Sequence, residues 1–138
     1  MERLFVYGTL RPSLYPWRKR PGGPVEEASL TGNYKLWNLG RFPAVVESQL
    51  PQRIVGETFE VEHIAPYDSY EGYLPNGKGL YDRKKVKIQL KDEVTTLEAW
   101  VYFMHHTTFH GEDGPKWAEP IESGDWGDVV LNKGGSGR

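Results

Sequence analysis

Short runs of β-prone residues, each closed by glycine or proline, recur along this chain and limit what it can fold into. Alternating apolar and polar residues over Tyr81–Leu90 predict a strand with one buried face. The run Thr95–His105 is apolar on both faces after its first residues and predicts a central strand. Further strands are expected at Leu4–Tyr7, Leu30–Leu39 and Arg53–Val61, with a short extended piece at 43–48. About six strands with one or two helical turns favour a small closed or nearly closed sheet.

The size and charge of the chain narrow its class. With 138 residues one domain is expected, which we place at 1–130, followed by a flexible tail at 131–138. The net charge of −2 gives no electrostatic reason to expect a nucleic-acid or membrane partner. No apolar run approaches the roughly 18 residues of a membrane span. The N-terminus shows no signal-peptide pattern, so a cytoplasmic location is expected. The absence of cysteine excludes disulfides, thiolate nucleophiles and zinc–thiolate sites.

The segments between the expected strands are rich in turn residues. Residues 11–29 contain four prolines and the basic run Arg18–Arg20, which we interpret as a solvated loop tip. His63–Tyr70 is expected to form a brief helix or turn, and 74–79 a turn. After His105 the periodicity ends, which predicts a loop held by aromatic anchors at Phe109, Trp117 and Trp126.

A glycine turn follows the first expected strand, in the sequence VYGTLRP. At such a turn, successive main-chain amides can converge and bind an anion. Gly8 lacks the Cβ that would keep a ligand from the main chain, and Thr9 adds a hydroxyl donor. Arg11 could strengthen this anion site or only flank it. The alternative is an ordinary glycine at the end of a strand. The spacing matches neither a phosphate-binding P-loop nor the three-glycine dinucleotide fingerprint.

A second feature is the carboxyl group of Glu71 in the sequence YDSYEGY. Aromatic neighbours can partly desolvate this group and raise its pKa towards the working pH of a general base. The alternative is a surface glutamate beside a turn. Asp68 competes for the same role, but we interpret it as a helix-capping or turn-forming residue.

The order of these motifs resembles that of a known family. FVYGTLRP is followed by YEG, YDRKKV, AWVYF and SGDW, as in the γ-glutamylcyclotransferase-like family and its γ-glutamylamine cyclotransferase (AIG2-like) branch, over residues 3–127. The resemblance implies an α+β fold: a small, mixed, β-barrel-like domain with short helices. It also implies that Glu71 is the catalytic acid/base. The substrate-binding loop would consist of Tyr7, Gly8, Thr9 and Leu10.

Members of this family release 5-oxoproline and an amine from a γ-glutamyl amine or γ-glutamyl amino acid. The α-amine of the substrate attacks the side-chain carbonyl of the same molecule, so the reaction needs no enzyme nucleophile, and we expect no cofactor. The resemblance therefore implies an enzyme whose partner is a small γ-glutamyl compound, and it leaves the leaving amine and the oligomeric state open. The alternative is a non-catalytic module that binds a small metabolite in the same pocket.

Further residues outside these two motifs are also of interest. Tyr102 matches a family tyrosine near the substrate, or it is a core tyrosine with a satisfied hydroxyl. Arg83 is expected to be structural. His105, His106 and His110 raise the question of a metal, but no metal site is expected because they lie in a glycine-rich stretch without helical spacing.

Overall fold

The computed structural model describes residues 1–16, 23–71, 81–105, 109 and 115–135, with side chains up to Leu131. The basic run Arg18–Arg20, the turn predicted at 74–79, and two of the three histidines, His106 and His110, lie outside these residues. Within the described ranges the chain forms six strands and two helices: β1 (Glu2–Val6), β2 (Glu26–Asn38), β3 (Pro43–Val61), α1 (Ala65–Glu71), β4 (Tyr81–Leu90), β5 (Thr96–Met104), β6 (Glu119–Pro120) and α2 (Trp126–Gly135).

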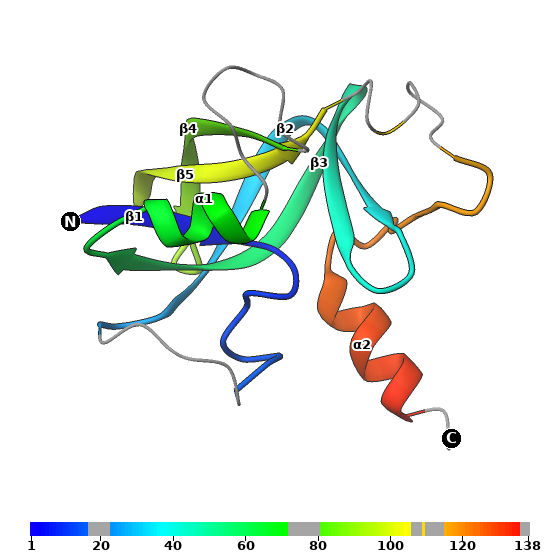
Figure 1. Cartoon of the computed structure of the whole chain (residues 1–138), viewed down its shortest axis with the longest axis horizontal. Helices are drawn as coiled ribbons and strands as arrows, with labels where there is room; N and C mark the ends of the chain where they lie inside the picture. The colour runs from blue at the N-terminus through cyan, green and yellow to red at the C-terminus, as the bar shows by residue number, and fades with distance from the viewer. Residues whose placement is uncertain (17–22, 72–80, 106–108, 110–114, 136–138) are drawn as a thin grey trace.

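The strands form one mixed sheet that returns on itself (Figure 1). Their order is β3-β1-β5-β4-β2-β6, and β3 also pairs with β2, so five strands complete a ring. β1 runs parallel to β5 and antiparallel to β3. The ring is narrowly paired between β2 and β4, where Ala28 opposes Leu90 and Ser29 opposes Gln89. This arrangement confirms the predicted mixed sheet with few short helices.

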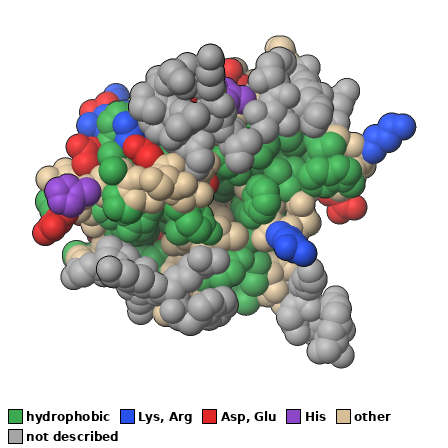
Figure 2. Space-filling view, viewed as in Figure 1, with side chains coloured by type: hydrophobic (Ala, Val, Ile, Leu, Met, Phe, Trp, Pro, Cys, Tyr) green, Lys and Arg blue, Asp and Glu red, His purple; other side chains and the backbone are tan. Residues whose placement is uncertain are grey.

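The core lies on both faces of β1, because its residues are apolar at successive positions. Phe5 and Tyr7 pack into one buried cluster with residues such as Leu30. Leu4 and Val6 pack into a second cluster that includes Phe59, Trp37 and Tyr102. Helix α1 lies across the second cluster, which its Tyr67 contacts. In the space-filling view, hydrophobic side chains gather in the middle of this face and most charged ones lie towards its edges (Figure 2).

Strand β3 is one long strand where the sequence predicts a short piece and a separate strand. Its pairing with β2 shifts at the expected break: Tyr34 opposes Glu47, whereas Gly32 opposes Gln52. The pairing therefore skips residues 48–51. Pro51 lies in this stretch and has no amide hydrogen to donate to the sheet, which is a physical reason for the interruption.

Two chain segments approach each other closely at Gly56 of β3. A Cβ at this position would lie 2.3 Å from the carbonyl oxygen of Val6 and 2.6 Å from Cζ of Phe5. The pairing with β2 is regular here, with Ala28 opposite Gly56. Only glycine lets β1 and its phenylalanine pack this closely on β3.

The described residues after His105 contain more regular structure than the sequence predicts. β6 pairs with Trp37 and Asn38 of β2. α2 begins at the predicted anchor Trp126, which is buried and donates its indole N–H to the hydroxyl of Tyr15 at 3.0 Å. The helix continues to Gly135, past the start of the predicted tail at 131. The flexibility predicted for residues 131–138 stays a prediction.

Asp125 explains where α2 begins. Its Oδ1 accepts a hydrogen bond from the amide of Gly127 at 2.7 Å, which caps the helix N-terminus. The preceding Gly124 has a φ of +72°, and its carbonyl oxygen accepts a hydrogen bond from the amide of Val55 at 2.8 Å. The segment SGDW therefore folds back on β3, as expected for an anchored loop. Neither helix in the described part of the chain is long and apolar enough to cross a membrane.

Candidate active site

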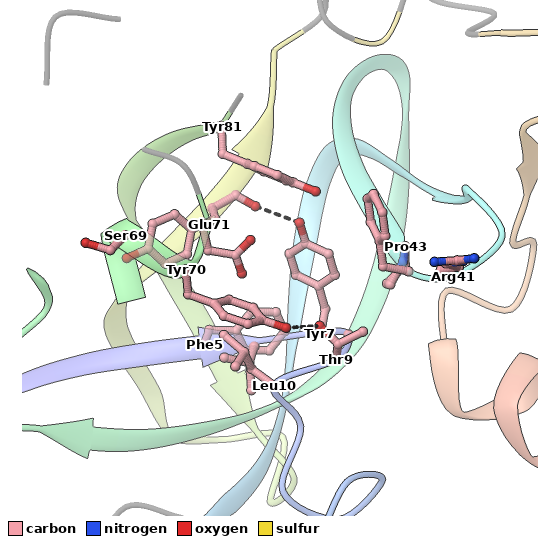
Figure 3. A pocket seen from close by; sticks show the side chains of 14 residues that line it. Phe5, Tyr7, Thr9, Leu10, Arg41, Pro43, Ser69, Tyr70, Glu71 and Tyr81 are labelled. Atoms are coloured by element: carbon pink, nitrogen blue, oxygen red, sulfur yellow. Dashed lines mark hydrogen bonds between the residues drawn. The ribbon is translucent and has the colours of Figure 1, made fainter. Parts of the chain in front are cut away.

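A cavity of about 450 Å³ opens beside the C-terminal end of β1. This volume suits a small molecule. The cavity walls come from the loop after β1, the segment 41–43, helix α1, and strands β4 and β5 (Figure 3). The sequence analysis assigned six residues to a site, and all six line this cavity: Tyr7, Gly8, Thr9, Leu10, Glu71 and Tyr102. The fold thus brings together residues that are up to 95 positions apart in the chain.

Glu71 is the last residue of α1, and its carboxyl group points into the cavity towards the ring of Tyr7 (Figure 3). Among the described lining residues, Glu71 has the only carboxyl group and Arg41 has the only positively charged side chain. Burial raises the pKa of Glu71 from 4.5 to about 7, because few water molecules can solvate its charged form. At neutral pH, both the carboxylate and the carboxylic acid are therefore populated, so this group can accept a proton and also return one.

Three buried tyrosines surround Glu71. Burial raises the pKa of Tyr7, Tyr81 and Tyr102 well above the usual value of 10, and the nearby Glu71 carboxylate adds to each rise. All three phenols therefore stay protonated and neutral at neutral pH. Tyr7 donates its hydroxyl hydrogen to the main-chain oxygen of Tyr102 at 2.7 Å and accepts from the amide of Val45 at 3.4 Å. These tyrosines can form walls and donate hydrogen bonds, but they cannot serve as bases.

The loop after β1 forms one wall of the cavity. Its turn is closed by the amide of Arg11, which donates to the carbonyl of Gly8 at 3.0 Å. Within the described residues, the amides of Gly8, Thr9 and Leu10 donate to no protein acceptor. The hydroxyls of Thr9 and Tyr70 form an exposed hydrogen bond of 3.2 Å between the loop and α1.

Gly8 has a packing role that the sequence did not indicate. A Cβ on this residue would lie 2.6 Å from Cγ of Pro43, closer than real Cβ contacts allow. The glycine is therefore required by the packing of the loop on the start of β3. The predicted role, an open approach for a ligand to the main chain, stays a prediction.

Arg11 was predicted either to strengthen the anion site or only to flank it. Its side chain does not line the cavity, which favours the second role. Its guanidinium is buried and contacts two carboxylates: Asp125 at 2.8 Å and Glu57 at 3.7 Å. Glu57 also accepts hydrogen bonds from the amide and the hydroxyl of Ser13. Arg11 therefore flanks the loop and ties it to β3 and α2.

Asp68 is the residue whose predicted role is wrong. It was expected to cap a helix or form a turn, but its carboxylate turns towards the sheet. Tyr102 donates its hydroxyl hydrogen to Oδ1 at 2.6 Å, and Nη1 of Arg83 donates to Oδ2 at 2.8 Å. Arg83 is thus structural, as predicted. Tyr102 lines the cavity and its hydroxyl has a partner, while its predicted place near a substrate stays a prediction.

Several lining residues were not predicted. Tyr70 could have been found because it directly precedes Glu71. Tyr81 could have been found because it lies two positions from Arg83 in a predicted strand, so both side chains are on the same face. The segment 41–43 gives no such signal, since only the closure of the sheet brings it to the cavity. His105 lies with Nδ1 3.7 Å from an oxygen of Asp82. Within the described residues, no three acidic or histidine side chains are grouped as a metal site requires.

Comparison with known proteins gives a consistent result. A sequence model of the family described as "Gamma-glutamyl cyclotransferase, AIG2-like" matches residues 4–128. A relative from Methanocaldococcus jannaschii, named "Putative gamma-glutamylcyclotransferase", is 34% identical in an alignment of 109 residues that covers 75% of this chain and 84% of the relative.

Two solved structures show a similar fold. A protein from Pyrococcus horikoshii gives a TM-score of 0.58 at 18% identity, covering 100% of both chains. An AIG2-like protein from Mus musculus gives a TM-score of 0.53 at 20% identity, covering 75% of this chain and 77% of the mouse chain. With the family match over most of its length, the chain belongs to the gamma-glutamyl cyclotransferase, AIG2-like family.

Proposed function

We propose that this protein is a γ-glutamylcyclotransferase that releases 5-oxoproline and a free amine from a γ-glutamyl amine or a γ-glutamyl amino acid. In this reaction the α-amine nitrogen of the substrate forms a bond to the side-chain carbonyl carbon. The amide bond between that carbon and the leaving nitrogen breaks. The observation that carries the proposal is a single, largely desolvated carboxyl group, Glu71, with its pKa near 7, in a cavity beside the turn at Gly8.

The loop after β1 would bind the α-carboxylate of the substrate. The amides of Gly8, Thr9 and Leu10 have no protein acceptor within the described residues, so they can donate to a bound carboxylate. Holding the carboxylate at the loop would direct the α-amine towards the substrate's own carbonyl. Correct orientation in an intramolecular attack can be worth about 7–11 kcal/mol of the barrier.

Glu71 would carry both proton transfers. As a carboxylate it takes a proton from the α-ammonium group, which frees the nitrogen lone pair for the attack. As a carboxylic acid it returns the proton to the leaving nitrogen when the amide bond breaks. One group can perform both steps because its pKa lies close to neutral pH. The surrounding tyrosines remain neutral and keep water away from this exchange.

The test is to incubate the protein with a panel of γ-glutamyl amines and γ-glutamyl amino acids and to measure 5-oxoproline. The wild-type protein should release it from at least one compound. Glu71→Gln should reduce the rate about 100-fold or more, the usual range for loss of a general acid/base. Glu60→Gln, which changes an exposed glutamate of β3, serves as the matched control and should leave the rate unchanged.

If no compound yields product above the Glu71→Gln level, the cyclotransferase proposal is wrong. Calorimetry with the same compounds then shows whether the protein binds any of them without turnover. Saturable binding that is equal in the wild type and in Glu71→Gln, without product, would identify a non-catalytic binding module.

A further inference from the structure

Helix α1 carries Glu71, yet few apolar contacts hold this helix to the sheet. It has seven residues, and none of their side chains is fully buried. The ring of Tyr67 packs at a tilt on Phe59, with 6.3 Å between the ring centroids. A helix this short is not stable by itself in water. Polar contacts must therefore contribute to its position.

The strongest polar contacts of α1 meet at Asp68. Its carboxylate accepts one hydrogen bond from the hydroxyl of Tyr102 at 2.6 Å. Nη1 of Arg83 lies 3.0 Å from one carboxylate oxygen and 2.8 Å from the other. The guanidinium of Arg83 lies over the ring of Trp100, 4.5 Å from its centroid. One side chain of α1 thus joins the helix to both β4 and β5.

These contacts are largely shielded from solvent, which makes them stronger than surface ion pairs. The side chains of Arg83 and Asp68 are 17% and 20% exposed. A charge-assisted hydrogen bond in such a place contributes more than an exposed pair, and removing one partner leaves the other poorly solvated. Stacking on Trp100 also fixes the plane of the guanidinium.

Asp68 and Glu71 are three residues apart on the same helix, so they lie on neighbouring sides of one turn. The contact of Asp68 with the sheet and the entry of Glu71 into the cavity therefore depend on the same helix position. Tyr102 strengthens this link, because its hydroxyl binds Asp68 and the same residue lines the cavity.

We propose that Asp68 is a positioning residue: by binding Arg83 and Tyr102 it fixes α1 on the sheet and keeps the carboxyl group of Glu71 inside the cavity. The kinetic consequence rests on the proposed function above. The structural consequence, the burial of Glu71, does not.

Other charged and titratable groups also face Glu71, and their influence on its pKa must be distinguished from the effect of anchoring α1. They come from every element around the cavity and comprise Tyr7, Tyr70, Tyr81, Tyr102 and Arg41. The buried tyrosines are neutral at neutral pH. If α1 loses its anchor, water reaches Glu71 and its pKa falls from about 7 towards 4.5.

Two substitutions distinguish the effect of the position of α1 on the pKa of Glu71 from the effect of nearby charge. Asp68→Asn removes a negative charge near Glu71, which lowers the pKa of Glu71 through electrostatics alone. Arg83→Gln removes a positive charge, which by electrostatics alone would raise it. If Asp68 and Arg83 act by holding α1, both substitutions release the helix and both lower the pKa of Glu71. Opposite shifts would show that only charge matters and would overturn the proposal.

The experiment uses the full chain with ¹³C-labelled glutamate carboxyl groups, and NMR titration reports the pKa of Glu71 directly. We expect Asp68→Asn and Arg83→Gln each to lower it by about one unit or more. Arg83→Lys, which keeps the charge, should lower the pKa of Glu71 less than Arg83→Gln does. Glu47→Gln is the control, because it breaks the 2.8 Å pair with Lys84, the residue next to Arg83 on β4, without touching α1.

Release of 5-oxoproline provides the second readout. Asp68→Asn should lower kcat about tenfold or more with a smaller change in KM, and should move the pH profile to lower pH. If the wild type releases no 5-oxoproline, the proposed function fails, but the NMR titration still decides whether Asp68 positions Glu71. Circular dichroism checks the fold. If Asp68→Asn does not fold, the milder Tyr102→Phe decides: a smaller downward pKa shift supports the proposal, and an unchanged pKa overturns it.

Discussion

The hydroxyls of Thr9 and Tyr70 lie 3.2 Å apart, so the loop after β1 and the helix that carries Glu71 meet at the edge of the cavity (Figure 3). This contact joins the two parts that the proposed reaction needs, the anion-binding loop and the acid/base. It is exposed and formed by two neutral groups, so its contribution to stability is small.

The first prediction concerns this contact. Thr9→Val and Tyr70→Phe each remove it with little change in shape, and each should raise KM several-fold because the loop is less well held over the substrate. Combining them should add little, since both remove the same bond. A double-mutant cycle on KM for the preferred substrate should give a coupling of about 0.5–1.5 kcal/mol. Fully additive effects would show that the contact does not matter in the bound state.

The second prediction concerns the pH dependence of the reaction. Because the base form of Glu71 is required first, kcat/KM should rise with pH and reach half of its maximum at about pH 7. Initial rates of 5-oxoproline release between pH 5 and 8.5 measure this profile. An ordinary glutamate would already be ionised at pH 5.5, so a flat profile above that value would contradict the assigned role.

The third prediction concerns Gly8. Gly8→Ala places a methyl group 2.6 Å from Cγ of Pro43, and the proline ring cannot rotate away. The loop must therefore shift, which should cost about 1–3 kcal/mol of stability and raise KM. Gly23→Ala is the matched control, because a Cβ there has no neighbouring atom within 4 Å.

Urea unfolding and steady-state kinetics measure both effects of Gly8→Ala. Adding Pro43→Ala in the same chain should recover part of the lost stability, because it removes the atoms that collide. If Gly8→Ala is as stable and as active as Gly23→Ala, the loop does not need to pack on Pro43 as the structure shows.

Local patterns predicted the parts of the fold that depend on local sequence. The alternation over Tyr81–Leu90 gave the bounds of β4, and the apolar run after it gave most of β5. The turn at Gly8 and the aromatic surroundings of Glu71 are also visible in short segments, but each pattern left an ordinary structural alternative open, and only the resemblance to the family assigned the two segments to one site. The cavity then forms where the fold brings these two segments together.

Contacts between distant segments could not be predicted in this way. The role of Asp68 depends on Arg83 and Tyr102, which reach it only because β4 and β5 pair beside β1. For the same reason, nothing in the sequence placed residues 41–43 at the cavity. Helix α2 was also not predicted, but for a different reason. Its N-cap Asp125 is a recognisable signal before an apolar stretch, but the glycines that follow hid it.

The fourth prediction concerns the buried cluster of Arg11, Glu57 and Asp125. Arg11→Met should lower the free energy of unfolding by about 3–5 kcal/mol, because it leaves the 7% exposed carboxylate of Glu57 without its cation. The double variant Arg11→Met/Glu57→Gln should recover part of this loss. Lys84→Met is the control: its pair with Glu47 is exposed, and losing it should cost no more than about 1 kcal/mol in urea unfolding. Equal losses in the two single variants would contradict the buried role of Arg11.

The fifth prediction concerns the cost of burying Glu71. Its pKa is about 7 in the folded protein and 4.5 in an unfolded chain, so between these values the folded state binds the proton more tightly. The stabilisation from this tight proton binding is complete below pH 4.5 and is lost as the pH rises through about 7. The loss amounts to at most about 3 kcal/mol. Glu71→Gln cannot ionise, so this variant should keep its stability where the wild type loses it.

Urea unfolding at pH 5, 6, 7 and 8 tests this prediction. The variant should gain on the wild type as the pH rises and should be the more stable protein at pH 8, although its release of 5-oxoproline should be about 100-fold slower or more. Glu60→Gln should follow the wild type at every pH, because its carboxyl group is exposed. A difference between Glu71→Gln and the wild type that stays constant from pH 5 to 8 would mean that residue 71 titrates normally. In that case the cavity does not desolvate it, and the carboxyl group is not poised to transfer protons at neutral pH.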